Sequence, residues 1–232
     1  NTADVAASLN APAMSLSDSI GWQSIALATK VSGPYTAPAG TGTLAVRQLA
    51  AGGAQVGALD VKFDGMGRGE TPDQLHLHGT ASGVRIPGSS PTLLASAPLQ
   101  LDARYAPNSP TAPIVLALTH PLLQLNAQSD TKPAIKGNAT LNLPDLAPLA
   151  AAGGQKLEGH ADLAANFALP EASGDTTTVA LAGNIAALKG LEQAVGLIGP
   201  NGKLAAHATL TKKDDGQTVH LDTFTLDGRT LH

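Results

Sequence analysis

Hydrophobic and polar residues alternate along most of this chain, and the segment Glu158–Glu171 shows the pattern most clearly. Every second residue from Leu157 to Leu169 is apolar or glycine, and the residues between them include His160 and other polar side chains. A period of two places the two sets on opposite faces of a β-strand. At about 3.3 Å per residue, this predicted strand would be about 40 Å long, which is long for a compact domain.

The same alternation recurs in both halves of the chain and predicts about ten or more strands. Glycine and proline punctuate the segments between them, and Asp215-Gly216 is a strong hairpin signal. We therefore expect an all-β chain in which sequential strands pair antiparallel. The clearest alternating apolar sets are Leu44 and Val46; Leu59, Val61 and Phe63; Leu75 and Leu77; Leu99, Leu101 and Tyr105; Ile114, Leu116 and Leu118; Leu123 and Leu125; Val179 and Leu181; and Leu204 and Leu210.

One segment has a helical period instead. In residues 184–202, apolar side chains recur three or four positions apart, which predicts a short helix near residues 187–198. Asn184 is a suitable N-cap, and Gly199-Pro200 supplies a stop. A shorter helical turn is predicted after Asp145. The stripe of the longer helix consists of Ile185, Leu188, Leu191, Val195 and Ile198.

The organisation of the chain is predicted from its proline-rich stretches. Residues 86–98 and 105–113 are rich in proline and serine and fit either a linker or long edge loops. Because the alternation resumes in the same style on both sides, we favour loops and expect one domain over residues 1–232. The chain opens in the middle of a pattern, so we interpret it as a fragment of a larger protein.

Composition excludes several classes of function. The 232 residues are 43% hydrophobic but only 3% aromatic and 14% charged, with a net charge of −4. No basic footprint for nucleic acid is present, and a membrane barrel would need more aromatic residues for its girdles. The absence of cysteine removes disulfides, thiolate metal sites and cysteine nucleophiles.

Two motifs have a functional and a plain interpretation. His76 and His78 would share one face of a strand, as metal ligands sometimes do, but solvated polar residues are the favoured interpretation. Gly65, Gly67 and Gly69 resemble a phosphate-binding loop, yet the next predicted element is a strand rather than a helix. We therefore interpret this glycine-rich segment as a turn and expect no metal site.

No catalytic constellation is evident. The sequence has no GxSxG nucleophile elbow, and its aspartates lie at polar strand positions or turns, which is typical of solubilising groups. Carboxylates from distant strands could still meet in the fold. We expect no enzyme activity, no catalytic residue and no cofactor. The aspartates in question are Asp60, Asp64, Asp102, Asp162, Asp222 and Asp227.

The apolar face itself is the remaining candidate site. Many of its positions are small, among them Gly159, Ala161 and Gly183, so a long curled sheet would leave an open trough instead of a filled interior. Each buried methylene is worth about 0.8 kcal/mol, so a sixteen-carbon acyl tail would carry on the order of 12 kcal/mol. The predicted lipid-binding residues are Leu141, Leu143, Leu157, Leu163, Phe167, Leu169, Leu181, Leu204 and Leu210. The alternative is a structural or adhesive β-solenoid or sandwich with a dry, filled interior and no ligand.

Three stretches resemble a known family. GTGTLAVRQLAAGGAQVGALDVKFDG, LNLPDLAPLAAAGGQKLEGHADLAANFAL and NIAALKGLEQAVGLIGPNGKLAAHATL are similar in texture to the TamB family, the inner-membrane component of the translocation and assembly module. The resemblance runs from about Gly40 to the end, and the wider AsmA-like group shares the motifs. It implies a "β-taco", a long curled antiparallel sheet with a hydrophobic lumen.

The resemblance also implies a cellular role. Members of the family are periplasmic proteins anchored in the inner membrane, and they transport phospholipid between the membranes and aid outer-membrane protein assembly and secretion. The expected ligand is therefore phospholipid. Contact with the outer-membrane barrel TamA is expected through other parts of the full-length protein, because no clear partner-binding segment is recognisable here.

Overall fold

The computed structural model describes residues 2–17, 20–68, 71–87, 93–152, 154–169, 176–190, 199–213 and 216–228. The chain divides into two compact units, Asn1–His120 and Pro121–His232. Within the described ranges, both units consist of antiparallel β-strands and only one short helix is present. The structure therefore confirms the predicted all-β class, whereas the single domain over residues 1–232 stays a prediction.

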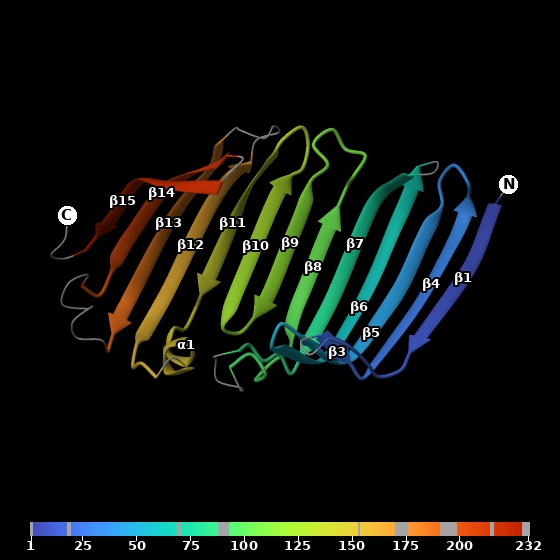
Figure 1. The fold of residues 1–232 in the computed structure, drawn as a ribbon, viewed down its shortest axis with the longest axis horizontal. Helices are drawn as coiled ribbons and strands as arrows, with labels where there is room; N and C mark the ends of the chain where they lie inside the picture. The colour runs from blue at the N-terminus through green and yellow to red at the C-terminus, as the bar shows by residue number, and fades with distance from the viewer. Residues whose placement is uncertain are drawn as a thin grey trace. The chain divides into compact units, whose positions relative to one another are not determined.

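The first unit is an up-and-down sheet whose hydrogen-bonded order is β1-β4-β5-β6-β7-β8-β9 (Figure 1). β2 and β3 form a small hairpin, and β3 also pairs with β5. The strands are β1 (Thr2–Ala11), β2 (Met14–Ser17), β3 (Ile20–Trp22), β4 (Ser24–Pro34), β5 (Ala39–Ala51), β6 (Ala54–Arg68), β7 (Thr71–Ser82), β8 (Leu99–Tyr105) and β9 (Ile114–His120).

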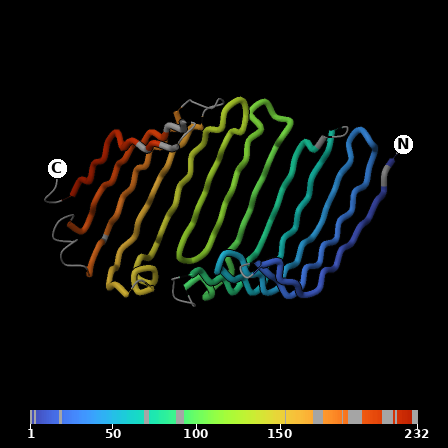
Figure 2. Tube along the Cα trace, in the orientation of Figure 1, coloured from blue at the N-terminus to red at the C-terminus, as the bar shows by residue number. Residues whose placement is uncertain are grey.

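The second unit repeats this arrangement, and its trace runs up and down in chain order from β10 to β15 (Figure 2). Its elements are β10 (Leu123–Asp130), β11 (Ile135–Leu143), α1 (Ala147–Ala152), β12 (Glu158–Leu169), β13 (Thr176–Lys189), β14 (Gly202–Lys213) and β15 (Gly216–Asp227). The long strand predicted from the alternation in Glu158–Glu171 is β12.

Strand register gathers the apolar residues of each unit on one face. Residues paired across antiparallel strands point to the same side of the sheet, so all residues of a cross-strand row lie on one face. In the first unit, one row is Leu9, Leu27, Leu44, Val61, Gly79, Leu101 and Leu118, and the adjacent row on the other face is Ser8, Ala28, Thr43, Lys62, His78, Asp102 and Ala117.

The second unit shows the same separation of faces. One row across its strands is apolar, and a row on the opposite face is almost entirely polar or charged. The first consists of Leu125, Leu141, Leu163, Gly183, Leu204 and Leu226, and the second of Gln124, Asn142, Asp162, Asn184, Lys203 and Asp227. The period-two alternation in the sequence therefore separates the two faces of this sheet as well.

The apolar faces are only partly covered. Among the described residues, the buried apolar side chains are few: Val46, Val61, Leu94, Ala112, Ala161 and Leu188. By contrast, Val5 is 59% exposed and Leu9 is 57% exposed on the apolar face of the first unit. A sandwich would cover such side chains with a second sheet at about 10 Å. Each sheet instead leaves large apolar residues in contact with solvent.

The helices differ from the expectation. The helical turn predicted after Asp145 is confirmed as α1, whose start is capped by a hydrogen bond from Ala147 N to Asp145 Oδ1 (2.9 Å). The helix expected near residues 187–198 is wrong for residues 187–189, which belong to β13. Residues 191–198 lie outside the described part of the chain.

Pairing on both sides explains why β13 continues where a helix was expected. Ile185 pairs with Ala161 on β12 and with Gly202 on β14, and Leu188 N donates a hydrogen bond to Pro200 O (2.9 Å). Leu188 is buried. These tertiary contacts outweigh the local three- and four-residue spacing of apolar side chains.

The glycine-rich segment after Asp64 is also not the predicted turn over most of its length. β6 extends to Arg68, so Gly65 and Gly67 are strand residues, and Gly69 lies outside the described ranges. Gly65 pairs with Gly40 on β5 and with Leu75 on β7. The Leu75 side chain lies against Gly65, at the position that a larger side chain there would occupy.

Candidate functional site

A hollow lies on the apolar face of the first unit. Its volume is about 790 Å³, which falls within the usual range of ligand pockets, roughly 300 to 1,000 Å³. Leu75 and Ile114 in its wall remain 42% and 40% exposed, so the hollow is open to solvent. β4, β6, β7, β8 and β9 contribute large side chains to its lining, among them Val31, Phe63, Leu75, Leu77, Tyr105 and Ile114.

Two large side chains that line this hollow, Phe63 and Leu75, lie over glycines on neighbouring strands. Gly42 pairs with Phe63, and the Phe63 ring occupies the space where a Cβ on Gly42 would lie. In the same way, a Cβ on Gly65 would lie 2.8 Å from Leu75 Cδ2. The large side chain of each pair therefore lies over its glycine partner.

Large side chains also lie over glycines in the second unit. This corrects the expectation that small residues such as Gly183 leave open space on the apolar face. A Cβ on Gly137 would lie 2.8 Å from Phe167 Cζ, and one on Gly183 would lie 2.6 Å from Leu163 Cδ2. The space beside Gly183 is therefore taken by Leu163 and is not left empty. Space for an acyl chain is therefore available because the apolar face is uncovered, and not because glycine lacks a side chain.

Eight of the nine predicted lipid-binding residues share one face of the second unit. The register places Leu141, Leu143, Leu163, Phe167, Leu169, Leu181, Leu204 and Leu210 on this side. Leu157 precedes the start of β12, whose register is also irregular between Glu158 and His160, so it is not part of the strand. Lipid binding at these positions stays a prediction.

None of the nine predicted lipid-binding residues lies in the first unit, where the 790 Å³ hollow is found. Alternation at Phe63, Leu75 and Tyr105 was visible in the sequence. However, alternation does not reveal where along the strands the face is hollowed, because this depends on which glycines and which large side chains become neighbours across strands.

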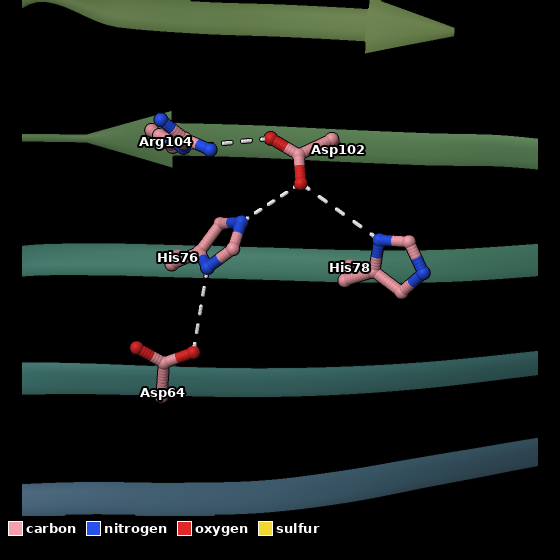
Figure 3. A network of polar contacts seen from close by, with 5 residues as sticks. All are labelled: Asp64, His76, His78, Asp102 and Arg104. Carbon is pink, nitrogen blue, oxygen red and sulfur yellow. Dashed lines mark hydrogen bonds and ion pairs between the residues drawn. The ribbon is translucent and has the colours of Figure 1, made fainter. Parts of the chain in front are cut away.

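The opposite, polar face of the first unit carries a charged network centred on Asp102 (Figure 3). His76 Nε2 lies 2.8 Å from Asp102 Oδ2, and His76 Nδ1 lies 3.5 Å from Asp64 Oδ1 on the other neighbouring strand. His78 Nδ1 lies 3.8 Å from Asp102 Oδ2, and Arg104 Nε lies 3.5 Å from Asp102 Oδ1. The network therefore ties β6, β7 and β8 together.

The hydrogen bond to His76 holds the pKa of Asp102 below its ordinary value, against the opposing effect of desolvation. Coulomb attraction to His76, Arg104 and His78 lowers it further. Across the described ranges, no group of three or more His, Asp or Glu side chains is arranged to hold a metal ion. His76 and His78 both contact Asp102 in a polar network on the solvent face.

A second carboxylate network lies on the polar face of the second unit. Asp222 Oδ2 accepts a hydrogen bond from Thr209 Oγ1 at 2.6 Å and lies 2.6 Å from His207 Nδ1, while Asp222 Oδ1 lies 2.7 Å from His220 Nδ1. The hydrogen bonds from Thr209 and His220 lower the pKa of Asp222 to about 2, against the opposing effect of desolvation, and a hydrogen bond and Coulomb attraction to His207 lower it further.

This lowered pKa predicts a dependence of stability on pH. Because the folded pKa lies below the ordinary value of about 3.9, the network stabilises the fold above pH 4, and this contribution is lost as the pH falls from about 4 towards 2. Thr209→Val should raise the pKa of Asp222 in an NMR titration and weaken this acid dependence in urea unfolding.

Thr225→Val is the matched control, because Thr225 lies on the same face but its hydroxyl contacts Ala205 O instead of Asp222. An unchanged pKa of Asp222 in the Thr209→Val protein would contradict the assignment of the main cause.

Comparison of the chain with protein-family models, with curated proteins and with solved structures found no match. Of the helices that the structure describes, none is long and apolar enough to span a membrane.

Proposed function

We propose that this chain is a periplasmic hydrophobic-groove segment that holds phospholipid acyl chains on their way between the inner and outer membranes. The observation that carries the proposal is the uncovered apolar face of the first unit, with its hollow of about 790 Å³. The membrane context, the inner-membrane anchor and the barrel partner TamA rest on the resemblance of the sequence to the TamB family.

The physical argument concerns the cost of moving an acyl tail through water. At about 0.8 kcal/mol for each buried methylene, transfer of a sixteen-carbon tail from a bilayer to water costs on the order of 12 kcal/mol of free energy. A sheet face with apolar rows across all its strands offers the tail a continuous apolar contact. Holding the tail there removes much of this barrier without any covalent chemistry.

The alternative is a structural or adhesive sandwich or solenoid. It agrees less well with the exposed fractions of the large apolar side chains. Such a protein stabilises itself by filling its interior to high density. Here Val31, Leu75 and Ile114 on the first unit are at least 40% exposed, and Phe224 on the second unit is 59% exposed. Contiguous exposed apolar surface of this kind is typical of binding sites.

The direct test is to purify the full chain under native conditions and to identify bound lipids by native mass spectrometry. We expect masses that correspond to bound phospholipid, which disappear after delipidation and return on incubation with phospholipid vesicles. A chain that neither carries phospholipid nor takes it up from vesicles would refute the proposal and favour the structural alternative.

Leu163→Asp tests the second unit. Leu163 lies on the apolar face between Leu141 and Gly183, so a carboxylate there should reduce crosslinking to a photoreactive phospholipid severalfold while the fold persists. Asn166→Asp is the control, because it adds the same charge at an exposed position on the polar face of the same strand. Equal crosslinking in both variants would count against lipid binding by this unit.

A further inference from the structure

Tyr105 brings a hydroxyl group to the apolar hollow of the first unit. It is the last residue of β8 and pairs with Leu75 on β7 and with Ile114 on β9, and all three residues line the hollow. Because paired residues of antiparallel strands lie on the same face of a sheet, the phenol ring lies on the apolar side. There it is partly buried.

The charged residues and the histidine that border the hollow belong to the polar face. They share one cross-strand row, which is adjacent to the row of Leu75 and Tyr105 and points to the other side of the sheet. Three of them take part in the polar network around Asp102, and Lys30 Nζ lies 3.5 Å from Asp4 Oδ1. No charged side chain of the described lining therefore lies on the apolar side. The residues of this row are Lys30, Asp64, His76 and Arg104.

Thr29 and Tyr105 place polar groups on the apolar side of the hollow. Thr29 Oγ1 donates a hydrogen bond to Ala7 O (3.5 Å). For the Tyr105 hydroxyl, the described residues provide no hydrogen-bond partner. Solvent reaches this hydroxyl while the hollow is open, but an acyl chain that fills the hollow would cover it. A covered hydroxyl without a partner costs free energy, and tyrosine hydroxyls usually find a partner when they are buried.

From this geometry we infer that the Tyr105 hydroxyl donates a hydrogen bond to the ester carbonyl of a bound phospholipid. The methylenes of an acyl chain offer no acceptor, whereas the ester at its head does, and a neutral acceptor suits a wall without charged side chains. The inference rests on the proposed function and adds which end of the tail lies at β8. From Tyr105 the tail runs towards Val31 on β4, across four strand spacings of about 4.8 Å, or about 19 Å.

A pair of phospholipids that differ only in the ester carbonyls tests this contact. Diacyl phosphatidylcholine carries these carbonyls, and its dialkyl ether analogue has the same chains and head group but lacks them. The full chain is incubated with vesicles that contain equal amounts of the two lipids, and the bound lipids are quantified by mass spectrometry. We expect the ester lipid to be bound in about three- to tenfold excess, which corresponds to one hydrogen bond between neutral groups.

Tyr105→Phe removes the hydroxyl and keeps the ring. This variant should bind the two lipids equally, with the ether lipid bound as well as by the unmodified chain. The carbonyl stretching band of its bound ester lipid should also lie at a higher frequency in the infrared spectrum, because the hydrogen bond to the carbonyl is lost. Tyr35→Phe is the matched control and should keep the preference, because Tyr35 is 62% exposed in the turn between β4 and β5, outside the hollow.

The possible results separate the contact of Tyr105 from lipid binding itself. If the unmodified chain binds both lipids equally, or if Tyr105→Phe keeps the ester preference and the carbonyl band, acyl chains are bound without this contact and only the inference fails. If the unmodified chain binds neither lipid, the proposed function fails and the inference fails with it.

Discussion

Replacing Leu75 by aspartate is expected to weaken binding of a sixteen-carbon fatty-acid probe about tenfold or more. Leu75 lines the 790 Å³ hollow and is 42% exposed, so the variant should fold. Loss of contact with two methylenes costs about 1.6 kcal/mol at 0.8 kcal/mol each, and about 1.4 kcal/mol corresponds to a factor of ten in affinity. Repulsion between the two carboxylates adds to this effect. Fluorescence titration with the labelled acid measures it.

Thr43→Asp provides the control for Leu75→Asp. Thr43 is exposed on the polar face of β5 and pairs with Lys62, so the new carboxylate lies opposite a positively charged residue. The net charge of this variant is the same as that of Leu75→Asp. Its affinity for the probe should stay within about twofold of that of the unmodified chain, because the new carboxylate lies on the face opposite the apolar lining of the hollow. If both variants bind the probe as well as the unmodified chain, the acyl chain does not occupy this hollow.

Gly42→Ala is expected to destabilise the chain by about 1 to 3 kcal/mol, the usual cost of overpacking. The new methyl group would collide with the Phe63 ring, and it would lie 2.9 Å from Ala28 O on the other neighbouring strand. Gly40→Ala on the same strand and face is the control. Its methyl group would be 3.5 Å from Val31 Cγ2, an ordinary contact, so the free energy of unfolding should stay constant or rise by up to about 1 kcal/mol.

Urea unfolding of both glycine variants measures the difference, and a double-mutant cycle identifies its cause. If the Phe63 ring is the obstacle, Phe63→Leu should cost less in the Gly42→Ala background than in the unmodified chain, with a coupling energy of about 0.5 kcal/mol or more. Strictly additive effects would show that Ala28 O or another backbone contact is responsible.

The faces of the sheet could be predicted from the sequence because they follow from a local rule. Alternation at Leu141, Leu163 and Leu204 fixes which side each residue takes once the strand exists, and antiparallel pairing then aligns equal sides. Local spacing of apolar residues could not show whether the segment near residues 187–198 forms a helix or a strand. The spacing of Ile185 and Leu188 fits a helix, and only the pairing of β13 with β12 and β14 makes those residues part of a strand.

The polar networks and the hollow depend on partners that are distant in sequence. The contact of His76 with Asp102 requires β7 to pair with β8 across residues 83–98, and no local pattern specifies that register. Likewise, Gly42 is an ordinary strand glycine until Phe63 is placed opposite it. Cross-strand register therefore determines both the charged network and the shape of the apolar surface.

The single-layer construction of the first unit has a consequence for how quickly a guest can exchange. An enclosed cavity must open before a bound chain leaves, so a lid or hinge limits the rate. A tail lying across Val31, Phe63 and Leu75 could instead detach from one strand at a time. Release then proceeds through many small steps, each breaking a few methylene contacts, and needs no rearrangement of the backbone.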